Sequence, residues 1–163
     1  YNLHMPWENT WLAAPTRYAA IRQALRTAGV TVKDINVTLG GCAFWHAVIS
    51  IKKQPGEAKN ALLAALSVMD LKHVVVVDDD IDVFDEERVL WAISNRFQAD
   101  RGLVVIANAQ GSELDPSAGP GGVNAKMGLD ATKPLTGFPP ELRVPEEVLE
   151  KISLDDFLPD FAK

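Results

Sequence analysis

Four consecutive valines followed directly by a run of aspartates constrain the fold of this chain more than any other feature. Residues Val74–Val77 are all β-branched, with no polar alternate, which is typical of a strand buried on both faces in a parallel sheet. Helical patterns flank this strand, over residues 55–69 and 86–97, and Asp85 is the expected N-cap of the second helix. This alternation predicts an α/β domain with at least one parallel crossover.

The other segments complete this prediction. Residues 1–15 have no clear period and are expected to form a loop, and residues 108–124 are rich in glycine and proline and are expected to form a long, functional loop. Periodicity predicts a helix over 16–28 and strands over 30–39, 43–51 and 103–107. We therefore expect a layered, mixed and partly parallel sheet flanked by helices, with a long loop and a proline-interrupted helical C-terminal tail. The expected domain covers residues 1–133, and residues 134–163 are the tail.

Composition narrows the function classes. The 163 residues carry a formal net charge of −6, so neither a nucleic acid nor an anionic membrane would find a basic surface. The single cysteine, Cys42, excludes an intrachain disulfide and indicates a reducing, cytoplasmic location. No apolar run approaches the length of a membrane span. Because the chain begins at Tyr1, we expect a piece of a longer protein.

The acidic run after the valines is the densest cluster of ionisable side chains. It comprises Asp78, Asp79, Asp80 and Asp82, at the end of a strand, where α/β sheets bind ligands. The spacing does not fit an EF-hand. A metal-dependent nucleotide-sugar transferase could use an Asp-x-Asp pair here. We favour a turn and helix-cap cluster that pairs with arginine, and therefore predict no metal site.

The remaining candidates are isolated residues. His46 is predicted to be a hydrogen-bonded core histidine, and Cys42 a small buried residue. Lys126 lies among apolar and small residues and could reach an anion; the alternative is an exposed lysine on a lid. Trp7 and Trp11 line a hydrophobic pocket or simply pack, and the sequence leaves both readings open.

Three ordered motifs carry a resemblance to a known family. They are Ile49–Lys59 (ISIKKQPGEAK), Val77–Arg96 with its aspartates and Trp91-Ala92, and Lys126–Thr132 (KMGLDAT). Together they resemble the C-terminal domain of UbiD-like decarboxylases. The resemblance implies a carboxy-lyase that reversibly decarboxylates an aromatic or α,β-unsaturated carboxylic acid with prenylated FMN as electron sink. The open alternatives are the transferase above and a noncatalytic interaction module.

The same resemblance implies a division of labour. The flavin, a divalent metal (Mn or Mg) and K⁺ would be bound mainly by an N-terminal domain that this sequence does not include. The catalytic residues would also come from that domain, so the chain alone is expected to be inactive. The present domain would close the substrate pocket and help to form a dimer or higher homo-oligomer through residues 134–163.

The resemblance also assigns roles to individual residues. The segment 1–15 would enter the cleft between the domains and face the flavin, and the loop after the last expected strand would approach the substrate. Lys126 is the candidate cofactor ligand, and Arg96 would pair with Asp78, Asp80 and Asp82. The expected pocket-lining residues are Asn9, Trp11, Ala13, Gln110, Ser112 and Leu114.

Overall fold

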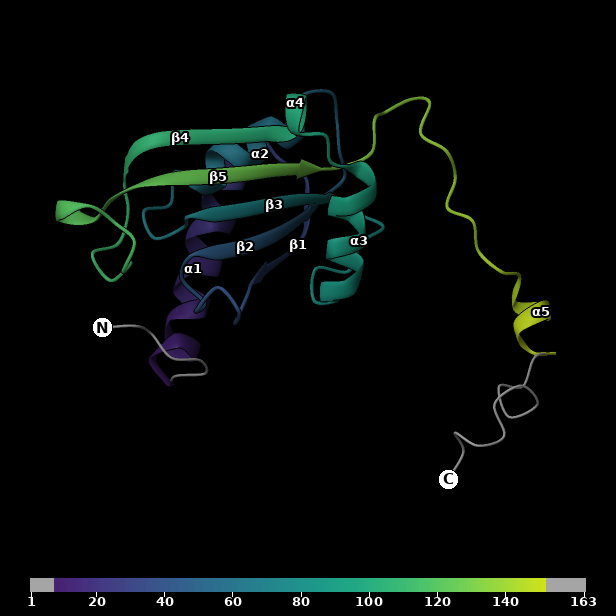
Figure 1. The fold of residues 1–163 in the computed structure, drawn as a ribbon, viewed down its shortest axis with the longest axis horizontal. Coiled ribbons are helices and arrows are strands. Elements are labelled where there is room, and N and C mark those ends of the chain that lie inside the picture. The colour runs from purple at the N-terminus through teal and green to yellow at the C-terminus, as the bar shows by residue number, and fades with distance from the viewer. Residues whose placement is uncertain (1–7, 152–163) are drawn as a thin grey trace.

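A five-stranded mixed sheet with helices on both faces forms the body of the molecule (Figure 1). The computed structural model describes residues 8–151. The strands are β1 (Val32–Val37), β2 (His46–Ile51), β3 (His73–Asp78), β4 (Leu103–Gln110) and β5 (Val123–Ala131). The helices are α1 (Glu8–Thr27), α2 (Glu57–Leu66), α3 (Glu86–Arg96), α4 (Ala99–Gly102), the 3₁₀ turn η1 (Pro120–Gly122) and α5 (Glu146–Leu149).

The strand order is β1-β2-β3-β5-β4. The three inner strands β2, β3 and β5 are parallel, and the two edge strands β1 and β4 are antiparallel to their neighbours. The expected mixed, partly parallel sheet flanked by helices is therefore confirmed.

The valine run is buried on both faces, as predicted. Val74 and Val76 pack into a core under α1 and α2, whereas Val75 and Val77 pack into a second core under α3. All four are at most 4% exposed. Since successive side chains of a strand point to opposite faces, one short run anchors helices on both sides of the sheet.

Strand β5 is the main departure from the sequence-based expectation, which predicted no strand after residues 103–107. Residues 123–131 instead form a strand between β3 and β4. The loop is therefore shorter, from residue 111 to 122. Strand β4 extends the strand predicted at 103–107 and is an edge strand, on which Val105 is 62% exposed.

Helix α1 is longer than predicted. It begins at Glu8 and continues through Pro15, so residues 8–15 are helical instead of a loop. The Thr16 hydroxyl donates to the Ala13 carbonyl, three residues earlier in the helix, at 2.7 Å.

Strand β2 begins later than predicted. Residues 40–45 form turns, and Cys42 and Ala43 have positive φ angles of 57° and 50°. Gly41 is required there, because a Cβ on it would lie 2.3 Å from the His46 Cβ. Cys42 is buried, as expected, and lies in this turn.

Two helix predictions differ in detail. The Asp85 side chain accepts from the Arg88 N–H at 3.0 Å and caps α3, as predicted. Leu90 of α3 is 63% exposed, and Met69, which closes the predicted helical pattern at 55–69, lies beyond the end of α2 and is 51% exposed. The buried residues of α3 are Val89, Ala92 and Arg96.

Residues after Lys133 run away from the sheet (Figure 1). Helix α5 falls within the predicted helical stretch at 146–152, whereas the stretch predicted at 154–157 lies outside the described residues. The tail returns to the body at Glu141, which forms two hydrogen bonds with Arg88. Within residues 8–151, no helix combines the length and apolarity needed to cross a bilayer.

Candidate functional site

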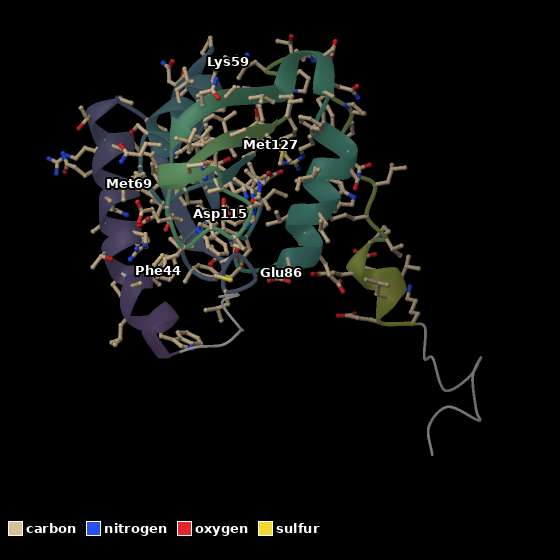
Figure 2. All side chains as sticks on the ribbon, turned by 60° about the vertical axis from the view of Figure 1, so that its left-hand side comes forward. Phe44, Lys59, Met69, Glu86, Asp115 and Met127 are labelled. Carbon is tan, nitrogen blue, oxygen red and sulfur yellow. The ribbon has the colours of Figure 1, made fainter. Side chains whose placement is uncertain are left out.

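One end of the sheet gathers most of the unusual side-chain contacts. The parallel strands β2 and β3 start here in register, with His46 opposite His73, and Met127 of β5 lies opposite His73. The 38–45 turn, the 111–122 loop and the first turns of α1 lie at the same end (Figure 1). We call it the strand-start end. Figure 2 looks onto it, with Phe44, Asp115 and Glu86 across the view.

A buried ion pair fixes the 111–122 loop on this end. Lys72, just before β3, bonds Asp115 at 2.8 Å and also donates to the Ser117 hydroxyl. Asp115 also accepts from the Ser117 N–H and from Asn124. Burial alone would raise the pKa of Asp115, but these hydrogen bonds outweigh burial and lower the pKa to about 2. The loop is therefore held by an ionised carboxylate at neutral pH.

An arginine of α1 covers the 38–45 turn. The Arg17 guanidinium lies 3.9 Å from the centroid of the Phe44 ring and bonds Asp70 at 2.6 Å. This stacked geometry uses the flat face of the guanidinium and its charge together. Helix α1, the turn and the segment before β3 thus form one connected surface.

A cavity of about 480 Å³ opens at this end, between the sheet and α3. Its walls are mostly apolar, from Val48, Val75 and Val89 among others, and its polar groups are Thr38, His46, His73 and Glu86. The Thr38 hydroxyl lies 2.8 Å from His46 Nδ1. A cavity of this size with few polar groups is typical of small-molecule sites.

Both cavity histidines are neutral at neutral pH. Burial lowers the pKa of His46, and the neighbouring His73 lowers it further. Burial and the adjacent Lys72 lower the pKa of His73. The cavity therefore presents neutral imidazoles beside the Glu86 carboxylate. The predicted hydrogen bond of His46 is present, at the strand start instead of mid-strand.

One predicted pocket residue of α1 lies on a separate groove. Trp11 is 57% exposed and lines a groove along β1 with Tyr18 and Phe84. Ala13, two residues further along α1, is half-buried and does not line this groove. Asn9 belongs to the backbone of α1, but its side chain lies outside the described residues, as does Trp7.

The predicted pocket residues near the loop are divided between burial and exposure. Gln110 ends β4 and is exposed, Leu114 is 57% exposed, and Ser112 is buried, with its hydroxyl accepting from the Leu114 N–H at 3.2 Å. These residues and Trp11 share the strand-start end but do not line one common cavity. Residues that lie at one end of the sheet without lining a common cavity are expected where a second domain completes the pocket.

The aspartate cluster lies at the opposite end of β3. Arg96 donates to Asp78 at 2.8 Å and forms two hydrogen bonds with Asp80, at 2.8 and 2.9 Å. Asp82 is not part of this pairing, because its carboxylate accepts the Phe84 N–H at 2.9 Å and closes the turn before α3. The structure thus brings Arg96 to two of the three predicted aspartates.

Cations already occupy the positions that a metal would take at this cluster. Lys133 Nζ bonds Asp80 at 2.8 Å, beside Arg96. Burial would raise the pKa of Asp80, but these hydrogen bonds hold it well below its usual range. Across residues 8–151, no three histidine, cysteine or acidic side chains are grouped to bind a metal ion. The donor set does not fit the metal-dependent transferase alternative.

Lys126 has a structural role instead of the predicted anion-binding one. It is 3% exposed, and its ammonium donates to the carbonyls of Leu66, Val68 and Met69 at 2.9, 2.9 and 3.1 Å. An ammonium has three N–H donors, and all three are used at the end of α2. Neither a flavin phosphate nor exposure on a lid fits this geometry.

Sequence reasoning missed the Lys72–Asp115 pair and the histidine pair. For the histidine pair, the one signal in the sequence was that His46 and His73 lie near the starts of consecutive strands. The starts of parallel strands meet at one edge of a sheet. The partners of the Lys72–Asp115 pair come from distant segments, and no local pattern links them.

Comparison with known proteins identifies the family to which the chain belongs. Residues 10–131 match the family described as 3-octaprenyl-4-hydroxybenzoate carboxy-lyase C-terminal domain. The chain is 52% identical over 121 residues to the anhydromevalonate phosphate decarboxylase of Aeropyrum pernix, covering 73% of this chain and 28% of that protein. The enzyme of the same name from Methanothermobacter thermautotrophicus is 47% identical over 117 residues, covering 71% and 28%.

Solved structures agree. The UbiD-class enzyme HmfF from Pelotomaculum thermopropionicum, in complex with FMN, has a TM-score of 0.78 and 46% identity and covers 93% of this chain and 34% of that one. The 3,4-dihydroxybenzoic acid decarboxylase AroY of Klebsiella pneumoniae has a TM-score of 0.72 and 27% identity, covering 94% and 34%. The chain spans about a third or less of these relatives. With its mixed sheet and three motifs, it belongs to the UbiD family of carboxy-lyases and corresponds to their C-terminal domain.

Proposed function

We propose that this chain is the substrate-closing domain of a carboxy-lyase that uses prenylated FMN. The support is the match over residues 10–131 and the FMN and prenylated FMN bound by the HmfF structures. When bound, a prenylated flavin acts as the electron sink for loss of CO₂. The described residues contain no group suited to a metal, and Lys126 is committed to α2. We propose that the flavin, a divalent metal and K⁺ are held mainly by an N-terminal domain, as the family resemblance implies.

The strand-start end is the surface proposed to face that domain. Its loop is fixed by Lys72 and Asp115, its turn is covered by Arg17, and Trp11 stays exposed beside them. A rigid wall of this kind orients a substrate and excludes water when it closes over a flavin. The pairing of the 111–122 loop with Lys72 is the observation that carries this assignment.

The proposed substrate is anhydromevalonate phosphate or a close analogue, an unsaturated acid instead of an aromatic one. The relatives of that name are about half identical to this chain, whereas the aromatic acid decarboxylases are 27–30% identical. We infer that the enzyme works in the cytoplasm, in keeping with the single cysteine.

The test is decarboxylation by the full-length protein loaded with prenylated FMN. CO₂ release is compared for anhydromevalonate phosphate, 3,4-dihydroxybenzoic acid and vanillic acid, and for the isolated 163-residue chain. We expect turnover of the phosphorylated acid by the full-length protein and none by the isolated chain. Turnover of an aromatic acid alone would contradict the proposed substrate. Turnover by the isolated chain would contradict the proposal that the N-terminal domain supplies the catalytic residues.

A homo-oligomer is also proposed, with residues 134–163 at the contact. One UbiD-class neighbour was solved in an evolved dimeric form, and the tail carries exposed Leu135, Leu142 and Val144. Deleting residues 134–163 from the full-length protein is expected to reduce its mass in light scattering. An unchanged mass would assign the contact to another surface.

A further inference from the structure

A second, smaller cavity lies at the other end of the sheet, where β3 and β5 finish. Its volume is about 280 Å³, and Arg96, Lys53, Arg101, Gln98, Asp130 and Thr132 supply its polar groups. Figure 1 shows this end, beside α4, opposite the 111–122 loop. Three cationic side chains thus face one small space.

The acid in the wall is already engaged. Asp130 Oδ1 accepts from both the N–H and the hydroxyl of Thr132. Arg96 is balanced by Asp78 and Asp80 through its two terminal nitrogens. Lys53 donates to the Lys133 carbonyl at 2.8 Å. Arg101 is 66% exposed, and its contacts with Asp100 are 3.3 and 3.4 Å long. Apart from Arg96, the cavity wall therefore has two positively charged side chains, Lys53 and Arg101, and one carboxylate, Asp130.

An unused donor points to a ligand here. The Arg96 side chain is 2% exposed, and its Nε is buried without an acceptor. A buried N–H of a charged group that lacks a partner costs free energy, so such groups are almost always bonded to protein, water or a ligand. Arg96 is one of the residues that line this cavity.

We infer that this cavity binds a small tetrahedral oxyanion, of which phosphate is the model. Arginine donors arranged around a small polar space match the oxygens of phosphate. The volume suits a ligand of few atoms, since drug-sized sites start near 300 Å³. The site lies away from the strand-start end, so it is separate from the surface proposed to face the flavin.

Calorimetric titration of the full-length protein with inorganic phosphate tests this inference. We expect saturable binding with a dissociation constant on the order of 1 mM. Lys53→Met and Arg101→Met are each expected to weaken binding at least tenfold. Lys52→Met is the matched control, because Lys52 is exposed, lies next to Lys53 and does not line the cavity. Its affinity should equal that of the unmodified protein.

Methyl phosphate distinguishes the two sources of the ligand. Binding as tight as inorganic phosphate would assign the site to a phosphomonoester, and weaker binding would assign it to free phosphate. Absence of saturable binding, or an equal loss in Lys52→Met, would overturn the inference. Decarboxylation by Arg101→Met should match that of the unmodified protein, so failure here is distinguishable from failure of the proposed function.

Discussion

The backbone N–H of Lys133 donates to Asp78 Oδ2 at 2.8 Å and joins a residue two positions beyond β5 to the end of β3. Lys53 holds the carbonyl of the same Lys133, and Asp80 holds its ammonium. Every polar group of Lys133 is thus fixed where the chain leaves the sheet. Residues of all three family motifs, or adjacent to them, meet at this point.

Removing Arg96 should destabilise the protein strongly. Arg96→Met would leave Asp78 buried without its cation, and breaking a buried pair in this way costs about 3–5 kcal/mol. The free energy of unfolding in urea measures the loss. Arg143→Met is the control, because Arg143 forms an exposed pair with Glu141 and should change stability by less than about 0.5 kcal/mol. Equal losses would contradict the role given to Arg96.

Stability should depend on pH through Asp115. Its folded pKa is about 2, below the ordinary 3.8, so its contribution is full above pH 4 and is lost as pH falls toward 2. Asp115→Asn is expected to cost about 2 kcal/mol at pH 7 and progressively less below pH 4. Urea unfolding at pH 7, 4 and 3 gives the comparison.

Asp100 provides the control for that experiment. Its side chain is 72% exposed in a long pair with Arg101, and Asp100→Asn should change the free energy of unfolding at pH 7 by less than about 0.5 kcal/mol. A difference between Asp115→Asn and the unmodified protein that stayed constant down to pH 2 would refute the ion-pair explanation.

Lys126→Met should destabilise the protein without weakening flavin binding. The variant leaves three carbonyls at the end of α2 without a donor, at a cost of about 3 kcal/mol. Thermal unfolding measures stability, and FMN titration of the folded full-length protein measures binding. Lys59→Met replaces an exposed lysine of α2 and should leave both unchanged. Normal stability with lost FMN affinity would restore the anion-binding role.

Trp11→Ala tests the surface proposed to face the flavin. In the full-length enzyme we expect kcat/KM to fall about tenfold, which corresponds to about 1.4 kcal/mol of transition-state stabilisation. Leu12→Ala removes a neighbouring exposed side chain outside the groove and should change kcat/KM by less than twofold. Unchanged kinetics in Trp11→Ala would show that this ring only packs.

The sequence allowed the inner strand β3 and its flanking helices to be predicted because their signals are local. A run of β-branched residues and a capping aspartate act within a few positions. Strand β5 was missed because Asn124, Lys126 and Asp130 interrupt its apolar pattern. The Asn124 amide donates to Asp115, and Lys126 donates to the carbonyls at the end of α2, so these two partners come from segments distant in the sequence. Asp130 accepts from the nearby Thr132.

The candidate site was predictable only in part for the same reason. The match of Arg96 to the aspartates was visible because the residues lie within one motif. The contacts of Lys72 with Asp115, and of Arg17 with Phe44, join distant segments through the sheet. Charge and composition do not show which distant residues lie close together. These contacts could therefore be found only once the positions of the strands were known.

The position of β5 has a consequence for the growing polypeptide. Because the last strand inserts between β3 and β4, a nascent chain that has emerged only to residue 122 holds β4 without a neighbour and β3 with one open side. The sheet cannot be completed until residues 123–131 leave the ribosome. Translational pausing before Val123 would therefore present two unpaired strand edges to chaperones or to other nascent copies.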